Sequence, residues 1–403
     1  MFKAEDFFQR EDEEHIIKIR RALHMVPEVN MDLPETTAIV TDELESLAIP
    51  YSLKYAPSSV VGYINYGNVN PENAPAVGKE NHVMTIALRA DMDALPISEN
   101  TGLPFSSEHP GKMHACGHDA HTAMLLGAAA ALKRAEEKGV INCRVKLIFQ
   151  PNEEGPESGA MVMCENGVLN DVDFIFGQHI QQQLKTGEIG WIKGPYMAQC
   201  HSYEIEFRGR ASHATLPQEG RDALMMAVKA VNDIYFMNSR EIDPFANHII
   251  SVGQLNAGTA HNIIAEHAHM AVSVRTFDEK LDGFIRTRIL SICENAALEM
   301  GGTFSFIEDV SAFVVINDCN CTDRLISAAK KTVPEKKIHE LSKQMGSEDF
   351  SCFLRERPGC FSRIGTGNPE KGCTGVPHNS DLVIDEDALL TGSKLFTQLI
   401  LDI

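Results

Sequence analysis

The sequence lacks any long apolar segment. None of its 403 residues belongs to a run of the roughly 18 to 20 consecutive apolar residues that crosses a bilayer as a helix. The N-terminal segment MFKAEDFFQREDEEH carries charges throughout and no continuous apolar stretch, unlike a signal peptide or a transit sequence. These absences predict a soluble protein of the cytoplasm that has no membrane partner.

Basic residues are also few. The chain has 36 Lys and Arg residues against 56 Asp and Glu residues, which gives a formal net charge of -20. Nucleic acids and anionic membranes are themselves negative, so this excess of acidic residues argues against both as partners. We therefore expect a small-molecule partner.

The ten cysteines lack the regular spacing of a disulfide framework. In a reducing cytosol such cysteines are buried thiols or ligands more often than disulfides. Only Cys116 lies among other residue types that bind metals. Internal repeats are absent as well, and residues 68–81 (NVNPENAPAVGKEN) are typical of an exposed loop.

The length of the chain predicts two domains. Residues 83–88, 143–150 and 172–176 are short apolar runs rich in β-branched residues, which predict strands. Residues 119–138, rich in alanine and leucine and followed by Gly139, predict a helix between the first two strands. Alternating strands and helices indicate a layered α/β domain.

The pattern changes after Gly194. The segments that follow predict the order strand, helix, strand, strand, helix, strand, which is the ferredoxin-like arrangement. Their residues are 202–208, 222–238, 248–255, 267–276, 279–300 and 303–308. We therefore expect a module at 194–308 inserted into an α/β domain formed by 1–193 and 309–403.

Potential metal ligands crowd into MHACGHDAHTAML, residues 113–125. Imidazole nitrogens and thiolate sulfur are common metal ligands, and Cys116 and His118 can aim at one point if they lie on an irregular turn. Gly117 between them favours such a turn just before the helix. Each histidine alone would more simply be a solvated or capping residue, but three histidines with a cysteine favour a metal site.

Three further candidates follow predicted strands or lie in loops. Glu153 and Glu154 in PNEEG come after the strand that ends at Gln150, where α/β sheets place ligands, although adjacent glutamates are usually solvated. Neighbouring carboxylates can also divide metal binding and proton transfer between them. His179 in FGQHI and His378 in TGVPHNSD would each, alone, be ordinary structural or loop histidines.

Taken together, these motifs resemble the M20 family of metallopeptidases and amidohydrolases. Within it they are similar to the branch of auxin-conjugate hydrolases, hippurate hydrolases, N-acetyldiaminopimelate deacetylases and bacterial aminoacylases. The resemblance spans nearly the whole chain. It is carried by RRALHMVPE (20–28), RADMDALP (89–96), MHACGHDAHTAMLLGAA (113–129), FQPNEEG (149–155), GSEDFS (346–351) and His378.

The resemblance implies two divalent metal ions per subunit, of Mn²⁺, Zn²⁺, Co²⁺ or Ni²⁺. Their ligands would be Cys116, in the bridging position, with His118, Glu154, His179 and His378. Glu153 would be the general base. The wider family has a His-x-Asp motif where this chain has Arg89-Ala90-Asp91, so that histidine ligand is absent and His118 is expected to compensate.

The resemblance also implies a mixed-sheet catalytic domain with helices on both faces and an inserted lid and dimerisation domain, hence a homodimer or a dimer-based oligomer. His213 of GRASHATLP would reach an active site, commonly that of the partner subunit; by itself it would be a surface histidine. Asn262 and Arg275 match positions that approach substrate. An arginine can grip an α-carboxylate with two parallel hydrogen bonds, or it can simply pair with Asp278.

These expectations point to an amidohydrolase that cleaves N-acyl amino acids, as aminoacylases and deacetylases do, with water activated by metal and Glu153 as base. A dipeptidase or aminopeptidase of the same family is the alternative, and it would require a free α-amino group on the substrate. A catalytically silent homologue is disfavoured because the base and all five ligands are present.

Overall fold

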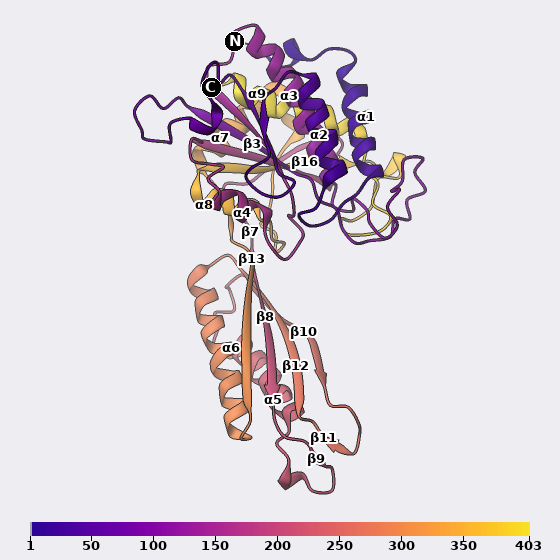
Figure 1. The fold of residues 1–403 in the computed structure, drawn as a ribbon, viewed down its shortest axis with the longest axis vertical. Helices are drawn as coiled ribbons and strands as arrows, with labels where there is room; N and C mark the ends of the chain where they lie inside the picture. The colour runs from indigo at the N-terminus through magenta and orange to yellow at the C-terminus, as the bar shows by residue number, and fades with distance from the viewer. Residues whose placement is uncertain (1) are drawn as a thin grey trace. The chain divides into compact units, whose positions relative to one another are not determined.

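The computed structural model describes residues 2–403. The chain forms two compact units. The large unit comprises the residues up to Tyr196 together with Val315–Lys343 and Asp349–Ile403, and the small unit comprises Met197–Val314 and Gln344–Glu348. In Figure 1 the chain is coloured from indigo at the N-terminus to yellow at the C-terminus, and both termini belong to the large unit.

A mixed sheet of eight strands forms the centre of the large unit. β3 pairs in parallel with β4 and β5, and β5 pairs in parallel with β16, whereas β2 and β4 are antiparallel. Across the sheet the strands are β1 (Tyr51–Ser52), β2 (Val60–Ile64), β4 (Arg144–Gln150), β3 (Thr85–Asp91), β5 (Phe174–Lys185), β16 (Gly359–Gly367), β6 (Ile189–Trp191) and β15 (Ile338–Glu340). Because β4, β3 and β5 run in parallel, their carboxyl ends meet at one edge of the sheet.

Helices cover both faces of this sheet, as the α/β prediction requires (Figure 1). On one face lie α1 (Asp12–Met25), α2 (Pro34–Ser46), α3 (His118–Glu137) and α9 (Leu389–Leu401), and α7 (Cys319–Thr332) packs against α9. On the other face α4 (Gly159–Glu165) packs against α8 (Phe350–Glu356). β7 (Gly194–Met197) and β14 (Val315–Asn317) form a short ribbon.

The central strands β3 and β4 are buried along their whole length, yet both contain basic residues. Lys146 of β4 donates to Val168 O at 2.8 Å and pairs with the buried carboxylate of Asp171. Arg89 of β3 is 1% exposed and is neutralised by partners at the edge of the sheet where the candidate site lies. Buried charges require such partners because their desolvation is otherwise costly.

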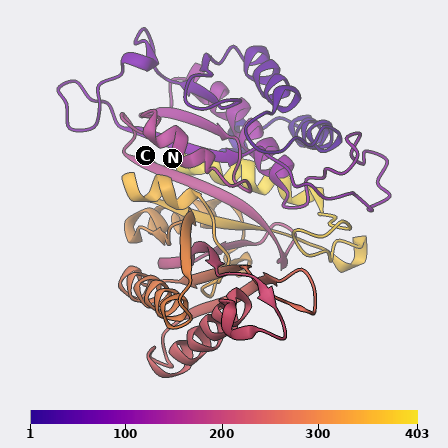
Figure 2. The same cartoon turned by 60° about the horizontal axis from the view of Figure 1, so that its bottom comes forward.

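The small unit has the predicted ferredoxin-like order. Its elements are β8 (Gln199–Arg208), α5 (Ala223–Arg240), β10 (His248–Ala257), β12 (His267–Thr276), α6 (Glu279–Glu299) and β13 (Thr303–Ala312). The sheet order is β10-β12-β8-β13 and every pair is antiparallel. Figure 2 shows α5 and α6 side by side on one face of this sheet.

The sequence of the small unit explains this packing. Along β8, Tyr203, Ile205 and Phe207 are buried while Glu204 and Glu206 are exposed, the period of two expected of a sheet with one covered face. The side chains of Asp222 and Asp278 cap α5 and α6 by accepting from backbone N–H groups of the first turn.

Two details of the small unit differ from the expected range of 194–308. β13 continues to Ala312, and Gln344–Glu348 joins this unit although it lies far along the chain. The reason is non-local hydrogen bonding: Ala198 N–H donates to Gly346 O at 3.0 Å, and Arg275 Nη1 donates to Met345 O at 3.0 Å. A two-stranded antiparallel sheet of β9 (Ser212–His213) and β11 (Ile263–Ile264) completes the unit.

Within residues 2–403, we find no helix that combines the length and the apolar character needed to cross a membrane.

The packing of α3 makes a prediction about stability. A Cβ atom added at Gly127 would lie 2.5 Å from Ser393 Oγ of α9 and 2.6 Å from Ile16 Cδ1 of α1. Because both neighbours are buried, we expect Gly127→Ala to lower the free energy of unfolding by about 1–3 kcal/mol, measured by denaturant titration. Gly283→Ala in α6 is the control, since its Cβ meets nothing within 4 Å, and it should stabilise by about 0.5–1 kcal/mol. A stabilised Gly127→Ala protein would contradict the packing.

Candidate metal centre

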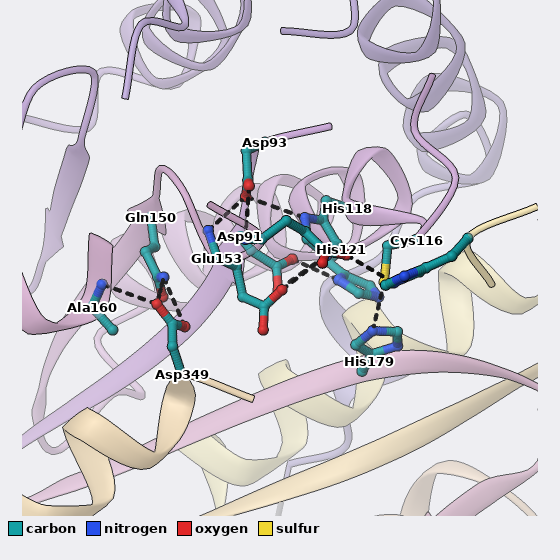
Figure 3. Close-up of polar contacts among 12 residues, drawn as sticks. Asp91, Asp93, Cys116, His118, His121, Gln150, Glu153, Ala160, His179 and Asp349 are labelled. Atoms are coloured by element: carbon teal, nitrogen blue, oxygen red, sulfur yellow. Dashed lines mark hydrogen bonds and ion pairs between the residues drawn. The ribbon is translucent and has the colours of Figure 1, made fainter. Parts of the chain in front are cut away.

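The five predicted metal ligands converge in the large unit. Cys116 lies in the turn before α3, His118 is the first residue of α3, Glu154 follows β4, His179 is in β5 and His378 lies in the loop after β16. Figure 3 shows the side chains of Cys116, His118 and His179 facing one another.

Cys116 is common to two clusters of ligand atoms. Cys116, His118 and His179 offer atoms that all lie within 4.8 Å of one another, and so do Cys116, Glu154 and His378. The shared thiol therefore lies between a nitrogen-rich group and a group that includes a carboxylate. Such a donor set suits divalent transition-metal ions.

Unusual backbone conformations position these side chains. Gly117 has a φ of 91°, and a Cβ there would lie 2.2 Å from Ile180 Cδ1, so only glycine fits between Cys116 and His118. His378 has a φ of 67°, and its N–H donates to Ala115 O at 2.7 Å, which ties the late loop to the turn before α3. Positive φ in a non-glycine residue is a form of strain that concentrates at functional sites.

His179 is oriented as a neutral ligand. Its Nδ1 lies 2.7 Å from Ile180 O, and since a carbonyl oxygen only accepts, Nδ1 carries the proton. Nε2 is then left unprotonated and faces the Sγ atom of Cys116 at 3.3 Å. Burial, together with the charge of Arg363, holds the pKa of His179 well below its usual range, which keeps the ring neutral.

The surroundings of His118 favour a cation. Neither of its ring nitrogens forms a hydrogen bond within residues 2–403, although the ring is 1% exposed. Asp93 Oδ1 lies 3.3 Å from Nδ1, and Asp91 Oδ2 lies 3.8 Å from Nε2. Burial is the largest single effect and would lower the pKa of His118, but Asp91, Cys116 and Asp93 together outweigh it and hold that pKa well above its usual range. The same negative environment would attract a metal ion.

Burial raises the pKa of Cys116 to about 12. The side chain is only 7% exposed, so at neutral pH the isolated thiol keeps its proton. A metal binds the thiolate rather than the thiol, and metal binding at this position must therefore release that proton.

The adjacent glutamates lie beside different histidines, although one oxygen of each carboxylate and a ring nitrogen of His118 all lie within 4.8 Å of one another. Glu154 Oε1 lies 2.9 Å from His378 Nε2, within the second ligand cluster, whereas Glu153 Oε2 lies 4.0 Å from His118 Nε2. Their backbone N–H groups both donate to the carboxylate of Asp93, at 2.9 and 3.0 Å. Asp93 thus holds the loop that carries both glutamates and also contacts His118.

Sequence reasoning missed this carboxylate and a second one, that of Asp349. The signal for Asp93 was RADMD at the end of β3, where polar residues follow an apolar strand. Asp349 accepts hydrogen bonds from Gln150 and Ser158, and it pairs with Arg89 at 3.0 Å. Burial raises the pKa of Asp349 to about 6.

The remaining histidines of the motif, His114 and His121, do not join the ligand clusters that contain Cys116. His114 is 2% exposed, neither ring nitrogen has a hydrogen-bond partner within residues 2–403, and burial lowers its pKa to about 3. His121 uses both of its ring nitrogens in hydrogen bonds to other parts of the large unit.

The small unit holds the other three predicted residues. His213 and Asn262 are brought together by the two-stranded sheet of β9 and β11, where Ala214 N–H donates to Asn262 O at 2.9 Å. Arg275 lies in β12 and donates to Met345 O, while the side chain of Asp278 accepts from backbone N–H groups at the start of α6.

A family model for the peptidase family M20/M25/M40 matches residues 87–402. The chain belongs to this family. It is similar to thermostable carboxypeptidase 1 of Saccharolobus solfataricus, 38% identical over 392 residues, which are 95% of this chain and 94% of that protein. It is also similar to N-acetylcysteine deacetylase of Bacillus subtilis, 34% identical over 386 residues, 95% of each chain.

Among solved structures, the chain resembles a dinuclear metal-binding peptidase of the M20 family from Bacillus subtilis. The TM-score is 0.80 at 29% identity, with 98% of this chain and 99% of that chain covered. The predicted family and fold class are therefore confirmed. As a member of this family, the chain is a metal-dependent hydrolase of amide bonds.

The protonated thiol of Cys116 makes a prediction about proton release. Adding Zn²⁺ to the metal-free protein should release about one more proton in the wild type than in Cys116→Ala, and the variant should hold less metal. Apparent affinity should rise with pH through the neutral range, because the raised pKa keeps the thiol protonated there. Calorimetry in buffers of different ionisation enthalpy measures the protons, and equal release from both proteins would contradict this role.

Proposed function

We propose that the clusters around Cys116 hold two divalent metal ions. The observation that carries the proposal is the sharing of one buried thiol by two ligand clusters, one with His118 and His179 and one with Glu154 and His378. The resemblance to a dinuclear peptidase of the same family supports it. Bound divalent ions would polarise an amide carbonyl and lower the pKa of water. Mn²⁺, Zn²⁺, Co²⁺ and Ni²⁺ are the candidate ions.

Glu153 is the proposed general base. Its carboxylate lies beside His118 but outside the cluster of Cys116, Glu154 and His378. A carboxylate beside a candidate metal ligand can accept a proton from the attacking water and deliver it to the leaving nitrogen, whereas Glu154 would bind metal.

The proposed substrates are N-acyl amino acids. The two relatives are named for a carboxypeptidase and for an N-acetylcysteine deacetylase. Both names describe cleavage of an amide whose nitrogen belongs to an amino acid with a free carboxylate. Arg275 is the proposed partner of that carboxylate and Asn262 of the amide, because a guanidinium can donate two parallel hydrogen bonds to one carboxylate.

His213 is the proposed donor to the oxyanion. Thr215 N–H donates to its Nδ1 at 3.3 Å, so the neutral ring carries its proton on Nε2. A histidine in this tautomer is a hydrogen-bond donor, which is the property that developing negative charge on an amide oxygen requires.

The small unit is the proposed lid and dimerisation domain. β10 is an edge strand of its sheet, and an unpaired edge favours pairing with a second copy. Large apolar side chains are exposed on β10 and on the adjoining part of the unit, namely Tyr235, Phe236, Phe245, Ile249 and Leu255. A homodimer through this surface would cover them. The cytoplasmic location stays a prediction.

The function is tested by hydrolysis of a substrate panel, with and without added Mn²⁺, Zn²⁺ or Co²⁺. N-acetyl amino acids and N-benzoyl amino acids should be cleaved, and chelation should abolish the reaction. Cleavage only of N-blocked peptides longer than two residues would favour a carboxypeptidase, the function named for one relative. A strict requirement for a free α-amino group would favour a dipeptidase or aminopeptidase. Full activity without metal would contradict the proposal.

The two glutamates provide a matched pair of variants. Glu153→Gln preserves shape and removes the proton acceptor, so turnover should fall by roughly 10²-fold or more while bound metal is retained. Glu154→Gln should instead weaken metal binding, because it removes a charged ligand. Metal content by elemental analysis and kcat by product release separate the two effects. Equal metal loss and equal residual rates would show that the assignment is wrong.

His213 makes a prediction about the dimer. His213→Ala should reduce kcat by about 10²-fold or more while metal content and fold stay intact, since it removes a donor rather than a ligand. If the histidine acts across the interface, mixing His213→Ala with Glu153→Gln should restore activity, because one site of each heterodimer regains both a base and a donor. Mixtures that stay inactive although heterodimers have formed would mean that His213 does not act on the partner subunit.

A further inference from the structure

His121 is the one histidine of the MHACGHDAHTAML motif that is fully hydrogen-bonded at both ring nitrogens. Nδ1 lies 2.6 Å from Asp91 Oδ1, and Nε2 lies 2.9 Å from the backbone nitrogen of Ile180. A backbone N–H can only donate, so Nε2 accepts and Nδ1 carries the proton that is donated to Asp91. The ring is therefore a neutral bridge with no lone pair left for a metal, although His121, Asp91 and His118 have ligand atoms close together.

This bridge lies where the backbone ladder between two central strands ends. β3 and β5 pair in parallel from Ile86 with Phe174 to Arg89 with Gly177, and no pair follows among the described residues. Asp91 and the segment His179–Ile180 lie beyond this last pair. Figure 3 shows the ring of His121 lying between Asp91 and His179.

Asp91 is held in place by a hydrogen bond from a buried arginine two residues earlier in β3. Arg89 Nη1 donates to Asp91 Oδ2 at 2.7 Å, Nε donates to Gln150 Oε1 at 2.7 Å, and both Arg89 and Asp91 are almost completely buried. Asp91 therefore offers one oxygen to Arg89 and the other to His121. The connection runs from Arg89 through Asp91 and His121 to the peptide that joins His179 and Ile180.

The peptide group after His179 is the one that orients the ligand. Its N–H, on Ile180, donates to His121, and Ile180 O accepts from His179 Nδ1 at 2.7 Å. The rings of His121 and His179 are also in contact, with centroids 4.4 Å apart. A shift of Ile180 would turn the imidazole of His179 and move its Nε2 away from Cys116 Sγ.

On its other side β5 remains paired with β16 through His179 and Ile180. We propose that His121 is a positioning residue, a neutral crosslink between β3 and β5 that fixes the metal ligand His179 on the side of β5 where the ladder with β3 has ended. The proposal rests on the proposed function only in taking His179 as a metal ligand. Groups that orient a ligand in this way commonly contribute ten- to a hundredfold to metal affinity.

Two substitutions test this role. His121→Gln keeps one donor and one acceptor on a planar group and can still bridge Asp91 and Ile180 N, whereas His121→Leu keeps bulk and loses both hydrogen bonds. The matched control is His114→Leu. It removes another buried imidazole of the same motif, but one whose ring nitrogens have no hydrogen-bond partner within residues 2–403. The affinity of the metal-free protein for Zn²⁺ is measured by competition with a chromophoric chelator, without any substrate.

His121→Leu should weaken Zn²⁺ binding by roughly ten- to a hundredfold. His121→Gln should stay within about threefold of the wild type, since a conservative bridge rescues a positioning residue and not a metal ligand, and His114→Leu should equal the wild type. Wild-type affinity in a folded His121→Leu protein would overturn the proposal. The proposal would also be overturned if His121→Gln bound Zn²⁺ as weakly as His121→Leu and both variants bound one ion fewer than the wild type. That result would make His121 a metal ligand.

The tautomer of His121 can also be measured directly in the wild-type protein, so this second test does not depend on the folding of a variant. In metal-free protein with ¹⁵N-labelled histidine, the signals of His121 should show a protonated Nδ1 and an unprotonated Nε2, and the addition of Zn²⁺ should leave this pattern unchanged. Direct coordination would shift Nε2 strongly and would overturn the proposal.

The outcomes distinguish this inference from the proposed function. If the predicted order of Zn²⁺ affinities appears in a protein that cleaves no N-acyl amino acid, the crosslink stands and the proposed substrate class is wrong. If the wild type hydrolyses the panel but the three variants bind Zn²⁺ alike, the crosslink is wrong and the function stands. A wild type that binds no Zn²⁺ would overturn both.

Discussion

The site depends on the neutralisation of one buried cation, the guanidinium of Arg89. It lies in the middle of a central strand with about 1% exposure, and it is compensated by Asp91, Asp349 and Gln150. An unpaired charge at this depth would be strongly destabilising, so the partners must stay close to it. Because Asp91 and Gln150 are the last residues of β3 and β4, their pairing with one cation holds together the two strand ends beside the loop that carries Glu153 and Glu154.

The sequence was most informative where chemistry and strand ends coincide. Cys116 and His118 could be proposed because they crowd into a turn before a predicted helix, and Glu154 and His179 because they follow or end apolar strands; the structure brings the four together. Local periodicity also predicted the ferredoxin-like module. The alternating burial along β8 and helix caps such as Asp222 depend on residues close together in the sequence.

The sequence was uninformative where partners are distant. Arg89 and Asp349 are 260 positions apart, and no pattern within either segment indicates the other. The same holds for Gln344–Glu348, which joins the small unit through hydrogen bonds to β8 and β12 segments. His121 shows a different limit: its residue type suggested a metal ligand, and only the directions of its two hydrogen bonds reveal that both nitrogens are in use.

The burial and the raised pKa of Cys116 have a consequence for oxidation chemistry. The thiolate is the form that peroxide and alkylating reagents attack, and a buried, protonated thiol is inert to both. Of the ten cysteines, Cys319 alone is exposed. The folded chain should therefore accept a maleimide or a spin label at Cys319 without damage to the sulfur of the candidate site, which gives α7 a ready position for spectroscopic probes.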